Sequence, residues 1–167
     1  MAFKLDAIEK MNTEDKYRYM NMLLTAQLSS EEDLLANLSN ASAIVNVAFD
    51  RINWVGFYLM KNRELVLGPF QGRPACNRIK YGCGVCGTAV KERRVIRVEN
   101  VHEFEGHIAC DSASNSEIVI PIIVNDEVFG VLDIDSPEFN RFLELEEGYL
   151  IKFVDKLKES IIVNSLK

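Results

Sequence analysis

The sequence lacks three features that would assign it to other classes of protein. Acidic residues outnumber basic ones, 25 to 19, and the net charge of -6 leaves no basic excess of the kind that a general nucleic-acid binder carries. No apolar run approaches the length of a transmembrane helix. Residues 1–6 contain no apolar segment of a secretory signal. We therefore expect a cytoplasmic protein that binds neither nucleic acid nor membrane.

The sequence also lacks internal repeats, low-complexity segments and linker-like stretches. Its 167 residues match the usual size of one domain and suffice to bury a core without disulfide bonds. We expect a single domain over residues 1–167, with N-terminal helices at about 4–48, a sheet with active-site loops at about 51–136, and a C-terminal helix at about 142–164.

Helical periodicity is confined to the two ends of the chain. Leu5, Ile8 and Met11 predict a first short helical segment, and Thr13 is the predicted N-cap of a second. Ser29–Glu32 fits a capping box at the start of a third. Three apolar faces are expected to point to the core: Tyr17, Met20, Leu24 and Leu28; Leu34, Leu35, Leu38, Ala41, Val45 and Ala48; Phe142, Leu145, Tyr149, Phe153, Leu157 and Ile161.

The middle of the chain alternates apolar and polar residues, which predicts strands. We expect them at 52–60, 64–70, 77–81, 93–98, 117–124 and 128–135, with a short helix at 84–92. Residues 99–116 form a long loop with both histidines, and loops of this length in a compact domain are usually functional. This order predicts an α+β fold, with an antiparallel sheet and the terminal helices on one face.

Two aromatic residues of the first strand share a face. Because side chains alternate along a strand, Trp54, Gly56 and Tyr58 point the same way. Gly56 could leave a slot between the two rings. From the strand alone the commoner arrangement is that the rings are core residues and the glycine allows close packing.

Acidic residues of the last hairpin also share a face. Asp133 and Asp135 are two residues apart on a strand, and Glu117 on the partner strand could join them. Such a face is either a solvated edge or a ligand site. Clustered carboxylates raise one another's pKa or hold a cation, and a substrate ammonium group is an economical choice of cation.

Cysteine is absent from most of the chain, and all four cysteines lie between Cys76 and Cys110. In a reducing compartment such clusters are more often catalytic, redox-sensing or metal-binding than structural. Cys86 falls in the first turn of a helix, where a thiolate is favoured or a substrate carboxylate could bind. Cys110 follows His107, and an imidazolium there would favour its thiolate.

The Cys83-x-x-Cys86 spacing has two further interpretations, a redox dithiol or half of a zinc site completed by Cys76 or by Cys110 with His107. Zinc sites usually contain two tight pairs, and only one is present. The βαβ context of a thioredoxin-like dithiol is also missing.

Five motifs in order resemble the free methionine-(R)-sulfoxide reductases, which are stand-alone GAF-domain enzymes. The motifs are Gly68–Gly72, Gly84–Ala89, Gly106–Asp111, Ser116–Ile122 and Leu132–Ser136. The resemblance covers nearly the whole chain. It implies a GAF-like fold, reduction of free L-methionine-(R)-S-oxide to methionine, and a role in methionine salvage under oxidative stress. The alternative is a GAF sensor or a redox or zinc switch without catalysis.

The resemblance also implies a thiol relay. Cys110 is the expected nucleophile, with Cys86 as the other candidate. The sulfenic acid that it forms condenses with Cys86 or Cys76. Thioredoxin then reduces the disulfide, and it receives its electrons from NADPH through thioredoxin reductase. No cofactor or metal is expected to be bound, a homodimer is expected, and Cys83 is an extra thiol.

The pocket follows from the same resemblance. Glu117 is the expected proton donor. Asp133 and Asp135 would hold the substrate ammonium, which explains selectivity for the free amino acid. Trp54 and Tyr58 would enclose the S-methyl group, with room provided by Gly56.

Overall fold

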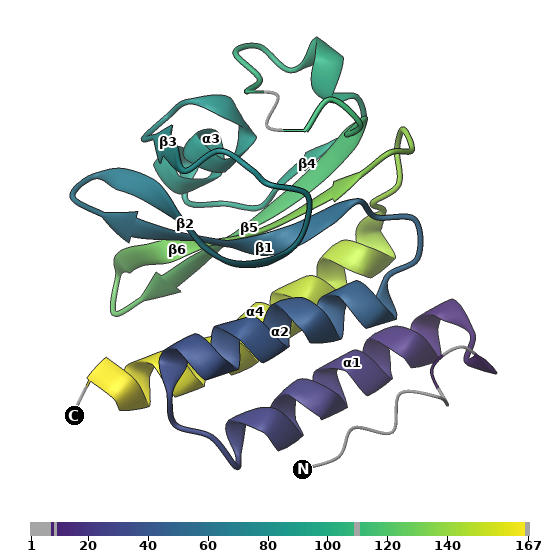
Figure 1. Ribbon diagram of the computed structural model, residues 1–167, viewed down its shortest axis with the longest axis vertical. Helices are drawn as coiled ribbons and strands as arrows, with labels where there is room; N and C mark the ends of the chain where they lie inside the picture. The colour runs from purple at the N-terminus through teal and green to yellow at the C-terminus, as the bar shows by residue number, and fades with distance from the viewer. Residues whose placement is uncertain (1–7, 9, 109–110, 166–167) are drawn as a thin grey trace.

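The protein folds around one six-stranded sheet (Figure 1). The computed structural model describes residues 8, 10–108 and 111–165. The elements are α1 (Thr13–Leu28), α2 (Leu34–Ala48), β1 (Trp54–Lys61), β2 (Glu64–Gly72), β3 (Arg78–Lys80), α3 (Gly84–Glu92), β4 (Ile96–Val98), the 3-10 helix η2 (Val101–Glu103), β5 (Ser116–Val124), β6 (Glu127–Ser136) and α4 (Glu144–Ser165). The strand order is β3-β2-β1-β6-β5-β4, with every pairing antiparallel.

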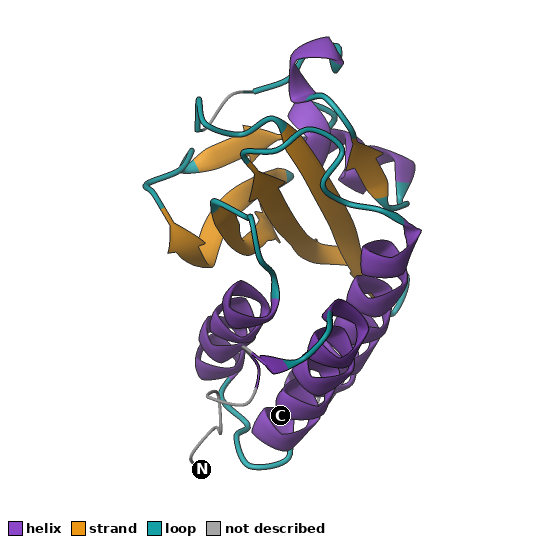
Figure 2. Ribbon diagram, turned by 90° about the vertical axis from the view of Figure 1, so that its right-hand side faces the viewer, coloured by secondary structure: helices purple, strands orange, loops and turns teal. Residues whose placement is uncertain are grey.

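Helices cover the two faces of the sheet unequally. The long helices α2 and α4 lie against one face, α1 packs on the outside of α2 and α4, and the short α3 lies on the other face (Figures 1 and 2). Val55 and Phe57 of β1 belong to the large core under the long helices, whereas Trp54 and Tyr58 belong to the smaller core around α3. The α+β prediction, with the terminal helices on one face, is confirmed.

Two tight turns join consecutive strands of the sheet. Asn62 and Arg63 join β1 to β2 with φ of 51° and 66°, and Asn125 and Asp126 join β5 to β6 with φ of 50° and 63°. Two successive residues with positive φ match the right-handed twist of the flanking strands. The tight second turn fixes the register that brings the acidic residues of β5 and β6 together.

The predicted helix starts need correction. Asn12, not Thr13, caps α1 and accepts a hydrogen bond from the Asp15 amide. The capping box predicted at Ser29–Glu32 is wrong, because both serine hydroxyls donate back to carbonyls at the end of α1. Asp33 caps α2 instead. The segment predicted from Leu5 lies mostly outside the described residues.

Two predicted core leucines face the solvent. Leu35 is 66 % exposed and Leu145 is 42 % exposed. In α4 the buried face contains Leu150, Phe153, Val154, Leu157 and Ile161. One turn before Leu150, the first position of this buried face is occupied by the charged residue Glu146. A search for apolar residues therefore does not find the position at which the buried face begins.

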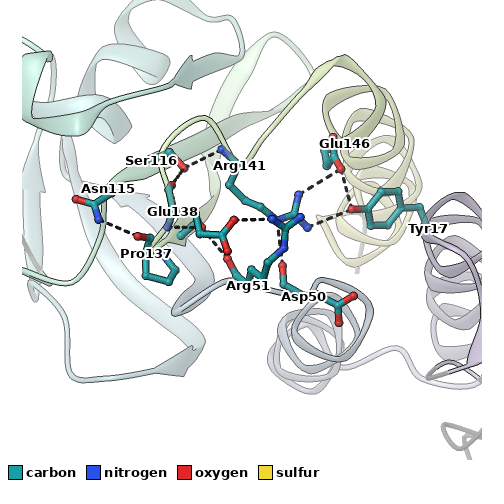
Figure 3. A network of polar contacts seen from close by, with 10 residues as sticks. Tyr17, Asp50, Arg51, Asn115, Ser116, Pro137, Glu138, Arg141 and Glu146 are labelled. Carbon is teal, nitrogen blue, oxygen red and sulfur yellow. Dashed lines mark hydrogen bonds and ion pairs between the residues drawn. The ribbon is translucent and has the colours of Figure 1, made fainter.

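A buried polar network joins the long helices to the ends of the central strands (Figure 3). The Arg141 guanidinium donates to the Asp50 carbonyl, to Glu146 Oε1 and to the Tyr17 hydroxyl at 3.0, 3.2 and 3.3 Å, and Tyr17 donates to Glu146 Oε1 at 2.9 Å. The backbone amide of Arg141 also donates to Ser116 Oγ. Ser116 is the first residue of β5, so the network anchors the backbone beside Glu117.

None of the described helices combines the length and apolar character that crossing a membrane requires.

Candidate active site

A small cavity lies between the sheet and α3. Its walls come from β1, α3, β5 and β6 and from the segment that contains His107, Ile108, Asp111 and Ser114. The residues predicted for the site that line it are Trp54, Tyr58, Cys86, Glu117, Asp133 and Asp135. The volume is about 30 Å³, which is room for about two water molecules.

Strand register brings the three carboxylates together. Glu117 of β5 is the cross-strand partner of Asp135 on β6. Asp133 lies two residues before Asp135 on the same strand and on the same face. In the other direction Asp135 pairs with Trp54, and Asp133 pairs with Gly56. Directly opposed side chains in antiparallel strands lie about 5 Å apart. The prediction that these residues share one face is therefore confirmed, and the solvated-edge alternative is wrong for Glu117 and Asp133, which are each only 6 % exposed.

Burial sets the charge state of these acids. It raises the pKa of Glu117 well above its usual value, and the charges of Asp133 and Asp135 raise it further. Burial also raises the pKa of Asp133 to about 6, and burial together with the Asp133 charge raises that of half-buried Asp135. The raised pKa favours the protonated form of Glu117, which is the form that can give up a proton.

Cys86 lies against this acidic group. It is the third residue of α3, is 3 % exposed, and its Sγ lies 3.9 Å from Glu117 Oε1. Burial, followed by the charges of Asp133 and Glu117, raises the pKa of the Cys86 thiol well above its usual value. The interpretation that the helix N-terminus favours a thiolate at Cys86 is therefore wrong, because desolvation and two nearby carboxylates outweigh the helix dipole.

The other cysteines occupy different environments. Cys83 is an exposed free thiol at the N-cap of α3 and does not line the cavity. The C-x-x-C pair thus has one exposed and one buried thiol, and it does not form a joint site. Cys76 is disulfide-bonded. Cys110, the predicted nucleophile, lies outside the described residues, so its role stays a prediction.

The aromatic wall differs from the predicted slot. A side-chain carbon on Gly56 would lie 2.4 Å from Phe70 Cβ and 2.6 Å from Trp54 Cη2. The Trp54 ring stacks on Phe70 and on Tyr58, with centroids 5.4 and 5.8 Å apart. The open slot is therefore wrong, and the close-packing interpretation is correct: Gly56 lets the indole lie against the strand. Trp54 and Tyr58 nevertheless line the cavity.

Hydrogen bonds from the surrounding backbone hold the rings in place. Trp54 Nε1 donates to the Arg73 carbonyl at 3.2 Å, and the Tyr58 hydroxyl donates to the Cys76 carbonyl at 3.0 Å. The irregular link between β2 and β3 therefore sets the position of the aromatic wall.

Sequence reasoning missed polar residues at the rim of the cavity. Asn53 Nδ2 donates to Asp111 Oδ2 and Ser114 Oγ at 3.1 and 3.0 Å. The Ala113 amide and Asn53 lower the pKa of Asp111, so its carboxylate is ionised. The run of small polar residues from Asp111 to Asn115 was a usable signal. No sequence signal identified Asn53, because its place at the rim depends on a hydrogen bond to Asp111, which lies 58 residues later in the chain.

His107 does not supply the positive charge considered from the sequence. Its Nε2 lies 3.8 Å from Glu117 Oε2. Burial, followed by the charge of His102, lowers the pKa of His107. The imidazole is therefore neutral at physiological pH. In that form it can accept or donate a hydrogen bond but does not stabilise a thiolate by charge.

An antiparallel sheet with long helices on one face and a small cavity on the other defines a GAF domain, and the GAF domain family model matches residues 32–157. The chain is 48 % identical over 157 residues to the free methionine-R-sulfoxide reductase of Escherichia coli, covering 94 % of this chain and 95 % of that protein.

Solved structures give the same family. A reduced form of fRMsr of Staphylococcus aureus superposes with a TM-score of 0.84 at 48 % identity, covering 87 % of this chain and 94 % of that one. The free methionine-R-sulfoxide reductase of Neisseria meningitidis, in complex with its substrate, superposes with a TM-score of 0.90 at 37 % identity, covering 93 % and 94 %. The chain belongs to the free methionine-R-sulfoxide reductases, the GAF-domain family that its motifs resemble.

Proposed function

We propose that this protein reduces free L-methionine-(R)-S-oxide to L-methionine. The observation that carries the proposal is the meeting of Glu117, Asp133 and Asp135 with an aromatic wall in one buried cavity. Each group matches one part of the substrate. Glu117 faces the sulfoxide oxygen, the carboxyl groups of Asp133 and Asp135 face the ammonium group, and the rings face the S-methyl group.

Glu117 is the proposed proton donor. The Cys110 thiolate attacks the sulfoxide sulfur, the oxygen passes to the cysteine, and Glu117 supplies the proton. The products are methionine and a cysteine sulfenic acid, so the cysteine is oxidised by the two electrons that reduce the sulfoxide. The raised pKa of Glu117 suits it to this step.

The sulfenic acid then condenses with a second thiol, which releases water and forms a disulfide. We assign this role to Cys76 in preference to Cys86, because Cys76 is disulfide-bonded here whereas Cys86 is a free thiol. Thioredoxin, reduced by NADPH through thioredoxin reductase, exchanges with that disulfide and restores both thiols. A cytoplasmic location and a homodimer belong to the same proposal.

Selectivity for the free amino acid follows from the acidic pair. Asp133 and Asp135 would contact the substrate ammonium, which a methionine residue inside a peptide lacks. A cavity of about 30 Å³ is too small for the amino acid, so its walls must separate when the substrate enters.

The test is NADPH consumption with thioredoxin and thioredoxin reductase. Free methionine-R-sulfoxide, its S epimer and a peptide-bound sulfoxide are supplied separately, and we expect turnover of the first alone. Activity with none of them refutes the proposed function, and equal activity with both epimers refutes its stereochemical part. Cys110→Ser should abolish turnover and Cys83→Ser should leave it nearly intact. Equal losses would refute this division of roles.

A further inference from the structure

The base of the cavity carries three side chains that could share one cation. Cys86 Sγ, a carboxylate oxygen of Glu117 and one of Asp133 all lie within 4.8 Å of one another, and all three residues are buried. They come from α3, β5 and β6, so their proximity rests on regular structure. A thiolate with carboxylate oxygens is a donor set that zinc accepts in proteins.

Asp133 provides independent evidence for a missing ligand. Its Oδ1 is buried and has no hydrogen-bond partner among the described residues. Asp133 as a whole is 6 % exposed and lines the cavity. Buried carboxylate oxygens are rarely left unsatisfied, since desolvation without a partner is costly. A group that occupies the cavity would supply the missing contact.

The dimensions suit an ion. Zinc–sulfur and zinc–oxygen bonds of about 2.3 and 2.1 Å at a tetrahedral angle separate sulfur from oxygen by about 3.6 Å. The Cys86 Sγ to Glu117 Oε1 distance is 3.9 Å, so a shift of a few tenths of an ångström would bring both atoms within bonding distance. A cavity of about 30 Å³ has room for an ion with a water molecule as the fourth ligand.

The charge of the cavity also favours a cation. Asp111 and Asp135 lie on its wall beside Glu117 and Asp133, and no lysine or arginine is among the described residues that line it. The Arg73 guanidinium lies 3.8 Å from the Asp111 carboxylate at the rim, and the Arg73 side chain is 75 % exposed. The acidic base of the cavity is thus left without a fixed counter-charge.

We propose that the reduced protein binds one thiophilic divalent cation, zinc or cadmium, through Cys86, Glu117 and Asp133, and that the bound ion excludes the substrate. The ion replaces the thiol proton of Cys86 and any proton on the two carboxyl groups, so protons are released on binding. It is an inhibitor and not a resident cofactor. The inhibition rests on the proposed function, whereas the binding does not.

Direct binding is the primary test. Reduced protein is titrated with zinc, cadmium or magnesium by calorimetry, and cadmium binding is also followed by the ultraviolet absorption of a cadmium–thiolate bond. We expect one zinc or cadmium ion per chain and no comparable magnesium binding, because magnesium prefers oxygen ligands. Absence of zinc binding, or equal binding of magnesium, overturns the proposal.

Variants locate the ion. Cys86→Ser and Asp133→Asn should each weaken zinc binding by at least about 10- to 100-fold, the range reported for loss of groups that only support a ligand. The matched control Cys83→Ser removes an exposed thiol of the same helix and should leave affinity unchanged. The Cys76→Ser/Cys110→Ser protein should also keep the ion. Retention in Cys86→Ser, or loss in either control, refutes the site, with far-UV circular dichroism verifying that each variant is folded.

Inhibition is tested separately. Zinc should raise the KM for free methionine-R-sulfoxide and leave kcat unchanged when thioredoxin is saturating. Binding without any change in KM refutes the exclusion of substrate. If the protein reduces no sulfoxide, the proposed function fails while calorimetry still decides whether the ion binds.

Discussion

The acidic cavity should make the protein less stable as the pH rises. The pKa of Asp133 is about 6 in the folded protein, against 3.8 without burial. A carboxyl group whose pKa is raised on folding stabilises the native state fully below its unfolded pKa, and that contribution disappears as the pH rises through the folded pKa. At about 1.4 kcal/mol per pKa unit, the loss for this one group is about 3 kcal/mol. About half of it falls between pH 5 and pH 8.

Asp133→Asn isolates this contribution. The amide keeps the size of the side chain and cannot ionise, so the variant should gain stability relative to the natural protein as the pH rises from 4 to 8. Over this range the relative gain should be at least about 2.4 kcal/mol, because the substitution also relieves repulsion of the Glu117 and Asp135 charges. Urea unfolding followed by circular dichroism measures it, with all thiols kept reduced so that one covalent state unfolds.

Glu127→Gln is the matched control. Glu127 begins β6, the strand that carries Asp133, and its side chain is exposed. Its substitution should change the unfolding free energy by no more than about 0.5 kcal/mol at either pH. If Asp133→Asn shifts stability equally at pH 4 and pH 8, Asp133 does not carry the cost of ionising a buried group, and the electrostatic account of the cavity is wrong.

Three further predictions follow from single contacts. Glu117→Gln cannot donate a proton and should lower kcat about 100-fold or more; a rise in KM alone would restrict Glu117 to binding. Arg141→Met leaves Glu146 buried without its cationic partner and should cost about 3–5 kcal/mol of unfolding free energy, against about 1 kcal/mol or less for the exposed Arg18→Met; equal costs would contradict this. Gly56→Ala should displace the only tryptophan, cost about 1–3 kcal/mol and change the fluorescence, and an unaltered spectrum would count against the packing argument.

Local periodicity predicted most of the fold. Alternation along β1 and β6 assigned Trp54 and Tyr58 to one face and Asp133 and Asp135 to one face, and both assignments are confirmed. These predictions succeeded because strand alternation is a property of the backbone. Register is a property of a pair of strands, so the sequence of one strand does not predict which residues of the neighbouring strand lie opposite it.

The errors share that cause. Gly56 suggested an empty slot because its partner across the sheet, Phe70, cannot be identified from β1 alone. Cys86 suggested a thiolate because the helix N-terminus is visible in the sequence, whereas Glu117 and Asp133 approach from strands 31 and 47 positions later. Leu145 was wrongly assigned to the buried face of α4 because the adjacent Glu146, a charged residue, occupies the buried position and pairs with Arg141.

The buried polar network and the acidic cavity illustrate two uses of burial. Arg141 and Glu146 are buried with each other and with Tyr17, so each charge has partners that offset its desolvation. Glu117 and Asp133 are buried against a thiol and a third acid, no lysine or arginine is among the described residues that line their cavity, and burial raises the pKa of both. The folded protein therefore has buried carboxyl groups in the cavity whose negative charge a substrate ammonium group or a metal ion can neutralise. The stability lost when Asp133 ionises and the capacity to bind a cation arise from the same missing partner, so Asp133→Asn should restore the stability and weaken cation binding.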